Sequence, residues 1–130
     1  MSQRTMTEPA FLVLTALVDA PRHGYGIVQE VEKLSEGRVQ LKIGTLYGVL
    51  DRLAADELVV LDREEAQQGR LRRYYRLTES GAQALEAEAA RLAENVRSAR
   101  ERLRVRSTHE RLHVWSAREQ LRVRHAGGLA

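Results

Sequence analysis

The chain has 130 residues, enough for one domain with an appendage, and its few aromatic residues (5%) mean that a core must consist mostly of Leu, Val and Ala. It contains no cysteine, which excludes disulfides and thiolate chemistry and fits a reducing compartment. No apolar run reaches membrane-spanning length and the N-terminus shows no signal sequence, so we expect a cytoplasmic protein without a membrane partner.

The net charge of +3 conceals an asymmetry along the chain. Residues 1–69 carry seven Lys/Arg and eleven Asp/Glu, a balance of −4, whereas residues 70–130 carry fourteen and seven, a balance of +7. Basic charge concentrated in one part of a chain favours an anionic partner. Arginine is abundant and lysine nearly absent, so a biased genome is an alternative explanation.

The first predicted helix begins at Met6-Thr7-Glu8-Pro9, where Thr7 is a suitable N-cap and the acidic and proline residues suit the first turn. The stretch from Phe11 to Asp19 is apolar nearly all round, which predicts burial on more than one side and contact with another protomer. Ala20-Pro21 is expected to end the helix.

A second helix is predicted after the turn His23-Gly24-Tyr25-Gly26. Its apolar stripe consists of Ile27, Val28, Val31 and Leu34. Gly37 can end it in the left-handed conformation. A short segment, residues 39–42, then leads to a third helix.

The third predicted helix, from Ile43 to Leu53, has two unlike faces. The apolar positions, spaced i, i+3, i+4 and i+7, are Leu46, Val49, Leu50 and Leu53. The polar face carries Thr45, Tyr47, Gly48, Asp51 and Arg52. Thr45 is expected to cap the start, and the helix should stop near Asp56-Glu57. Glycine inside a helix costs about 1 kcal/mol relative to alanine, so Gly48 indicates close approach of a partner, or else an ordinary amphipathic helix with a tolerated glycine.

Two helices joined by a short connection, the second with a polar outer face, form a helix-turn-helix. Residues Leu58 to Asp62 then predict a strand, Glu64 to Gly69 a polar turn, and Arg70 to Leu77 a second strand. Two strands around a polar tip directly after a helix-turn-helix make a wing. The second strand bears Arg70, Arg72, Arg73 and Arg76 with no acid among them. A solvated strand face is the alternative interpretation of this basic run.

Thr78 is expected to cap a long helix that carries a regular apolar seam. The seam residues, separated by 4, 3, 4, 3 and 4 positions, are Leu85, Ala89, Leu92, Val96, Ala99 and Leu103. This is coiled-coil spacing and predicts a homodimer; the alternative is a helix docked on its own domain.

Three tandem nonamers follow, at residues 98–106, 107–115 and 116–124. Nine residues make two and a half helical turns, so successive copies face opposite sides. Each copy contains a Ser-x-x-Glu capping box, which allows the helix to break and restart at Ser107. We interpret residues 107–130 as a helical or partly disordered tail and not as a domain.

The second nonamer contains His109-Glu110-Arg111-Leu112-His113, which matches the zinc-protease signature H-E-x-x-H. The histidines align with Arg100 and Arg104 of the preceding copy, so the match is a drifted form of the repeat. No Ser-His-Asp arrangement, P-loop or dinucleotide motif is present. We therefore expect no catalytic residue, no metal, no cofactor and no enzymatic activity.

Three blocks of sequence resemble the PadR family of bacterial winged-helix transcriptional regulators. They are His23 to Ile27; Gly44 to Tyr47 with Leu50 and Leu53; and Arg72 to Thr78 with Gly81. Together they cover roughly residues 8–105 in the order of the family. The resemblance implies a repressor that dimerises through its first and last helices and releases DNA when a small molecule binds.

Some residues depart from the family pattern. Glu57 stands where the family usually has glycine, and Gly48 where proline is common. The best-known drug-binding members place a Trp on the dimerisation helix, whereas the single Trp here is Trp115, beyond the seam. The effector site of the family therefore does not transfer to this sequence.

We predict a mainly α (α+β winged-helix) fold with a winged helix-turn-helix DNA-binding domain at residues 1–81, a dimerisation helix at 82–106 and a tail at 107–130. The predicted function is that of a sequence-specific repressor. It acts as a homodimer on a near-palindromic operator and is released by a small hydrophobic or aromatic effector. The alternative is a winged-helix module that binds protein and not double-stranded DNA; the basic wing favours DNA.

The residues predicted to contact DNA are Tyr25, Lys42, Thr45, Tyr47, Gly48, Arg52, Arg70, Arg72 and Arg73. The residues predicted to form the dimer are Phe11, Leu14, Leu85, Ala89, Leu92, Val96 and Leu103.

Overall fold

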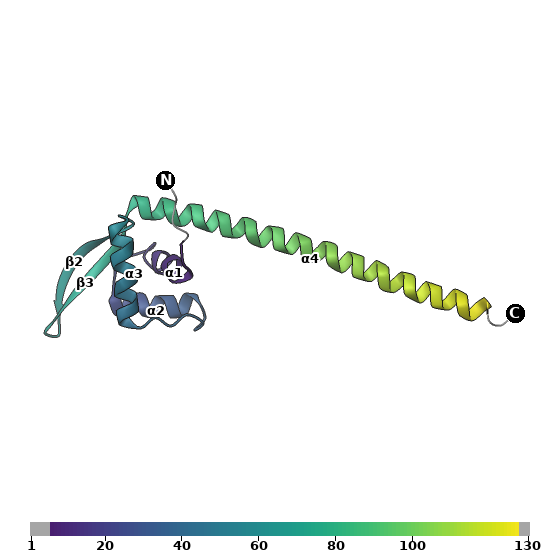
Figure 1. The fold of residues 1–130 in the computed structure, drawn as a ribbon. Helices are drawn as coiled ribbons and strands as arrows, with labels where there is room; N and C mark the ends of the chain where they lie inside the picture. Colours follow the sequence, from purple (N-terminus) through teal and green to yellow (C-terminus); the bar gives the residue numbers. More distant parts are fainter. Residues whose placement is uncertain (1–5, 128–130) are drawn as a thin grey trace. The chain divides into compact units, whose positions relative to one another are not determined.

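A computed structural model describes residues 6–127, with side chains described up to residue 119 (Figure 1). The elements in chain order are α1 (Glu8–Ala16), β1 (Arg22–His23), α2 (Gly24–Leu34), α3 (Ile43–Ala55), β2 (Val59–Gln67), β3 (Arg70–Leu77) and α4 (Glu79–Gly127). The three strands form one antiparallel sheet in the order β1-β3-β2. The predicted mainly α winged-helix fold is confirmed. The chain divides into two compact units, Met1–Ala90 and Arg91–Ala130.

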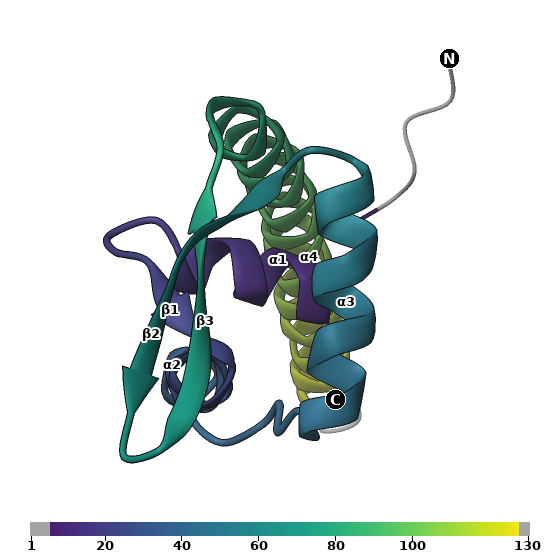
Figure 2. The same ribbon diagram turned by 90° about the vertical axis from the view of Figure 1, so that its left-hand side faces the viewer.

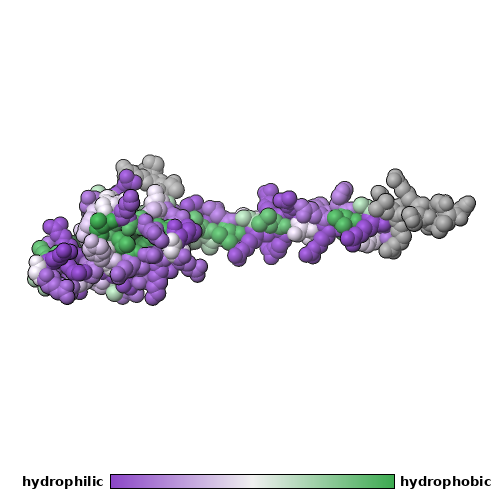
Figure 3. Space-filling model, turned by 90° about the horizontal axis from the view of Figure 1, so that it is seen from below, coloured by the Kyte–Doolittle hydropathy of each residue, from purple (hydrophilic) through white to green (hydrophobic). Residues whose placement is uncertain are grey.

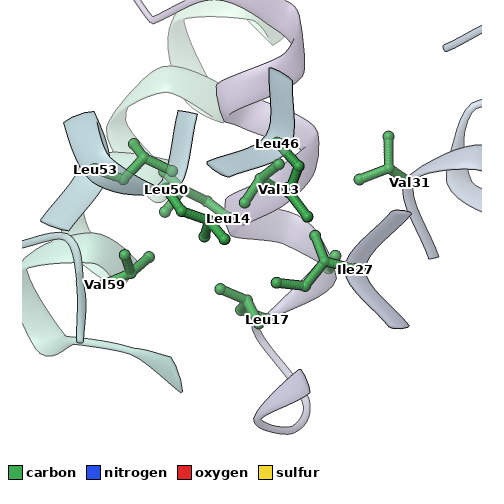
Figure 4. Close-up of a cluster of buried hydrophobic side chains, with 10 residues drawn as sticks. Val13, Leu14, Leu17, Ile27, Val31, Leu46, Leu50, Leu53 and Val59 are labelled. Atoms are coloured by element: carbon green, nitrogen blue, oxygen red, sulfur yellow. The ribbon is translucent and has the colours of Figure 1, made fainter. Parts of the chain in front are cut away.

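The core of the first unit lies where α1, α2 and α3 meet the sheet (Figure 4). The fully or almost fully buried side chains are Val13, Leu14, Ala16, Leu17, Ile27, Val31, Leu46, Leu50, Leu53 and Val59. Three of the four apolar positions predicted for the third helix are among them. Each buried aliphatic side chain of this size contributes about 1.5–3 kcal/mol to folding, so these residues fix which face of α3 is turned outward.

Helix α1 begins as predicted and ends earlier than predicted. The Thr7 hydroxyl accepts a hydrogen bond from the Ala10 amide at 3.2 Å, as an N-cap does. The helix stops at Ala16, several residues before Pro21. Arg22 Nε donates a hydrogen bond to the Ala16 carbonyl oxygen at 2.8 Å and so supplies a partner for one of the carbonyl groups that are left unpaired at the end of a helix.

Strand β1 was not predicted from the sequence. Its two residues pair with β3 in the register Arg22 with Tyr75 and His23 with Tyr74. A strand of two residues is too short to show an alternating pattern, so only its pairing reveals it. The pairing ties the start of α2 to the wing.

Helix α3 begins two residues before the predicted cap. Its N-cap is Lys42, which makes no side-chain capping bond, and Thr45 lies exposed within the first turn. The prediction of Thr45 as cap was therefore wrong. The end of the helix is confirmed: Asp56 is the C-cap, and Glu57 takes the left-handed conformation with φ 59°.

The hairpin is longer and its turn tighter than predicted. Strand β2 continues to Gln67, and the turn consists of Gln68 (φ 51°) and Gly69 (φ 76°) alone. Positive φ at both central residues is the geometry that suits a two-residue hairpin. Residues 64–67, predicted as turn, instead pair with residues 70–73 of β3.

Helix α4 begins as predicted, with the Thr78 hydroxyl accepting from the Gly81 amide at 3.0 Å. It then continues through Ser107 without a break. The Ser-x-x-Glu boxes do not act as caps, because no proline or glycine between residues 82 and 126 interrupts the helix. Among residues 6–127, no helix is long and apolar enough to cross a membrane.

Candidate nucleic-acid interface

The outer face of α3 and the β2–β3 hairpin lie on one side of the first unit (Figures 1 and 2). The polar face predicted for α3 is exposed at all of its positions, which are Thr45, Tyr47, Gly48, Asp51 and Arg52. Lys42, at the start of the helix, is also exposed. An exposed polar helix beside a wing is the arrangement that can enter the major groove of DNA while the wing follows the backbone.

Tyr47 is held in place by the start of α2. A Cβ atom added to Gly24 would lie 3.0 Å from Tyr47 Oη and 3.3 Å from Ile43 Cδ1, so the glycine leaves room for the tyrosine ring. Tyr47 remains 41% exposed, and Tyr25 in the same turn of α2 is 58% exposed. Both tyrosines were candidates from the sequence, which does not show that they lie beside the same helix start.

A shallow groove separates the start of α1 from α3. Its lining includes Thr7, Ala10, Thr45, Gly48 and Arg52. A Cβ atom at Gly48 would meet nothing within 4 Å, so neither the core nor a neighbouring helix requires glycine there. Gly48 therefore leaves the middle of the outer face open to a partner.

Two of the four arginines of β3 pair with carboxylates. Arg73 Nε lies 3.2 Å from Glu64, and Arg76 Nε lies 3.5 Å from Asp62, so two guanidinium groups pair with acids of β2. Sequence reasoning missed the Arg73 pair because Glu64, which it assigned to a turn, stands opposite Arg73 in the ladder. Among the described residues, no carboxylate pairs with Arg70 or Arg72. Exposed ion pairs contribute only about 0–1 kcal/mol, so a phosphate can compete for Arg73.

His23 joins α2 to the wing. Its Nδ1 accepts a hydrogen bond from the Gly26 amide at 3.2 Å and so caps α2. Its Nε2 lies 3.0 Å from Arg72 Nη1, and its ring meets Tyr74 edge to face at 5.3 Å between centroids. Arg63 in turn lies 4.1 Å above the Tyr74 ring. Sequence reasoning missed this cluster, because it assigned His23 to a turn.

The environment of His23 predicts a pH-dependent stability. Burial, and then the charge of Arg72, lower the pKa of His23 from 6.5. A base with a lowered pKa in the folded state binds fewer protons than in the unfolded chain, so its contribution is present above about pH 6.5 and is lost as the pH falls below that value. We expect the melting temperature to fall between about pH 7 and pH 5.

In the variant His23→Asn this part of the pH dependence should disappear, since asparagine caps a helix but does not titrate. Thermal unfolding followed by circular dichroism at several pH values measures the difference. An unchanged acid-induced loss of stability in the variant would exclude His23 as its source.

The residues predicted to form the dimer fall into two groups. Leu14 has 0% exposure and lies inside its own core, so it has no surface to offer a partner and the prediction for it was wrong. Leu85 packs against the same core. The other seam residues, Ala89 and Ala99 included, are exposed on α4, and the large ones among them are Leu92 (37%), Val96 (47%) and Leu103 (60%). Figure 3 shows apolar patches along α4 between hydrophilic side chains.

Within the described residues, no group of three His, Cys, Asp or Glu side chains is placed to hold a metal ion. His109 and His113 lie exposed on an uninterrupted helix. The H-E-x-x-H match therefore has no third ligand around it in this part of the chain.

Comparison of this chain with models of known protein families identifies one matching family. The model of the "Transcriptional regulator PadR-like family" matches residues 13–87. An uncharacterised 37.1 kDa protein in transposon TN4556 of Streptomyces fradiae is 45% identical over 82 residues, which cover 63% of this chain and 22% of that protein. "Transcriptional regulator Rv3488" of Mycobacterium tuberculosis is 38% identical over 85 residues, which cover 65% and 76%.

Among solved structures, PadR of Bacillus subtilis in complex with operator DNA has a similar fold. The TM-score is 0.54 at 23% identity, with 60% of this chain and 45% of that chain covered. The chain thus spans about a fifth of the Streptomyces protein's length and under half of the Bacillus chain.

Proposed function

Because the chain belongs to the PadR-like family of transcriptional regulators, which are not enzymes, we propose that it is a repressor that binds a near-palindromic operator as a homodimer. The observation that carries this proposal is the exposed polar face of α3 beside a wing in which Arg70 and Arg72 have no carboxylate partner among the described residues. The operator complex of the Bacillus relative supports the same use of the fold.

We assign different tasks to the two parts of the interface. Thr45, Tyr47 and Arg52 project from the helix that would enter the groove, where side chains distinguish base pairs by hydrogen bonds and apolar contacts. Arg70 and Arg72 belong to the wing, where guanidinium groups meet phosphates irrespective of sequence. A dimer would place two α3 helices at half-sites about 34 Å apart, or a multiple of that distance.

The proposed division of tasks predicts opposite results for two substitutions. Tyr47→Ala should lose about 1–3 kcal/mol on the operator and little on random DNA. Arg72→Ala should weaken binding to both duplexes alike. It should also lower the salt slope, which is the steepness with which the logarithm of the binding constant falls with the logarithm of the salt concentration, by about 1. Titrations of operator and random duplex at several salt concentrations measure both effects. If Arg72→Ala alone abolishes operator preference, the two tasks are reversed.

The competing function, a winged-helix module for protein binding, is favoured by the acids that pair with Arg73 and Arg76. A salt-dependent gel shift on the protein's own promoter region separates the two functions. We further propose that residues 1–81 bind DNA and residues 82–106 dimerise. A small hydrophobic or aromatic effector would act by dissociating the operator complex, which the same gel shift detects.

A further inference from the structure

The second half of α4 carries arginines along one side. Residues 97–118 contain seven Arg and two Glu. Residues three, four or seven positions apart lie on the same face of a helix of about 3.6 residues per turn. Five exposed arginines follow this spacing and are here called the arginine stripe: Arg97, Arg100, Arg104, Arg111 and Arg118.

The nonamer repeat accounts for the stripe. The first and third copies begin eighteen residues apart, which is five helical turns at about 3.6 residues per turn, so Arg100 and Arg118 face the same side. Arg111 of the middle copy follows Arg104 by seven residues and lies between them. The stripe is roughly 32 Å long at about 1.5 Å per residue, close to one turn of duplex DNA at about 34 Å.

Most of the stripe has no internal counter-charge. Arg97 pairs with Glu94 and Glu101. Within residues 6–119, no carboxylate pairs with Arg100, Arg104, Arg111 or Arg118. The open face between them is a shallow groove whose lining includes Ser107 and Thr108 together with the seam residues Val96 and Leu103.

The other side of the same segment differs. Arg106, nine residues after Arg97 and so on the opposite side of the helix, pairs through Nε with Glu110 at 2.9 Å. Four of the five stripe residues thus have no carboxylate partner within residues 6–119, whereas Arg106 on the other side is paired. Trp115, 64% exposed, lies between Arg111 and Arg118 in the groove that continues the stripe.

We propose that the arginine stripe binds the phosphate backbone of duplex DNA as a second contact, independent of sequence. The proposal rests on the DNA-binding function proposed above and extends it, because the stripe lies outside residues 13–87, which the family model matches. A row of cations of which four have no carboxylate partner within residues 6–119 fits a continuous row of phosphates. A second copy fits less well, since residues 97–118 hold seven Arg and two Glu, so the same segment of a partner would bring mainly like charge to the stripe.

The test compares two double variants of equal charge. Arg100→Gln with Arg104→Gln removes two stripe residues, whereas Arg102→Gln with Arg106→Gln removes two arginines from the opposite side of the same turns. Glutamine and arginine have similar helix propensities, so both variants should keep α4. Trp115 is the single tryptophan of the chain and reports DNA binding at the stripe by fluorescence.

Full-length protein is titrated with random duplex DNA at several salt concentrations. The stripe variant should lower the salt slope by about 1.8, at about 0.9 per phosphate contact, and reduce the response of Trp115. The control should keep the wild-type slope and response. Equal effects of the two variants, or a wild-type Trp115 that does not respond to DNA, would overturn the proposal.

Light scattering on the same samples measures the oligomeric state of each variant. A stripe variant that changes oligomeric state with unchanged DNA affinity would assign the stripe to the subunit interface and overturn the proposal. If the wild type shows no operator preference, the function proposed above fails. If it prefers the operator and the two variants behave alike, this inference alone fails.

Discussion

Replacing Gly81 with alanine is expected to destabilise the first unit by about 3 kcal/mol. The Thr78 amide donates to the Leu58 carbonyl oxygen at 3.1 Å, which brings the first turn of α4 against the end of α3. A Cβ atom at residue 81 would overlap that oxygen and would lie 2.8 Å from Leu77 Cδ1. Because the oxygen belongs to a hydrogen-bonded backbone, it cannot move without breaking the connection between α3 and α4.

The matched control is Gly48→Ala, the same substitution inside α3. Nothing lies within 4 Å of a Cβ at that position, so the variant should be up to about 1 kcal/mol more stable, since alanine favours helix. Each kcal/mol corresponds to roughly 4–8 °C in the melting temperature of a small domain. Thermal unfolding should therefore shift in opposite directions for the two variants. Equal melting temperatures would show that Gly81 is not sterically required.

If the proposed homodimer forms through α4, Leu92→Asp is expected to convert it to monomer and to weaken operator binding by about 100-fold or more, because one subunit then engages one half-site. The seam places Leu92, Val96 and Leu103 on one face of α4, where they are exposed in the single chain. Exposed apolar rows of this kind mark surfaces that bind a partner. An added carboxylate in the seam would have to be buried without a counter-charge.

The control for Leu92→Asp is Ala90→Asp, which adds the same charge to the same turn on the other side of the helix. Light scattering should show that this variant is still dimeric, and operator titration should show that its affinity is unchanged. If the Leu92→Asp protein stays dimeric, α4 does not form the dimer interface. If the Leu92→Asp protein is monomeric but keeps its operator affinity, dimerisation is not required for operator binding.

The sequence determined those features of this protein that depend on short stretches of chain. The spacing of Leu46, Leu50 and Leu53 predicted the buried face of α3 because a helix repeats every 3.6 residues whatever it packs against. The caps Thr7 and Thr78 were found for the same reason, since a cap satisfies amides within three residues. The exposed side of α3 followed from its buried side.

The tertiary structure decided which groups meet across the fold. Arg73 pairs with Glu64, which the sequence analysis assigned to a turn, because the two-residue turn at Gln68 sets the ladder register. His23 contacts Arg72, forty-nine residues away, because β1 pairs with β3. Apolar periodicity shows that a side chain such as Leu14 is buried but not whether its own core or a partner covers it, because both surroundings remove the same surface from water.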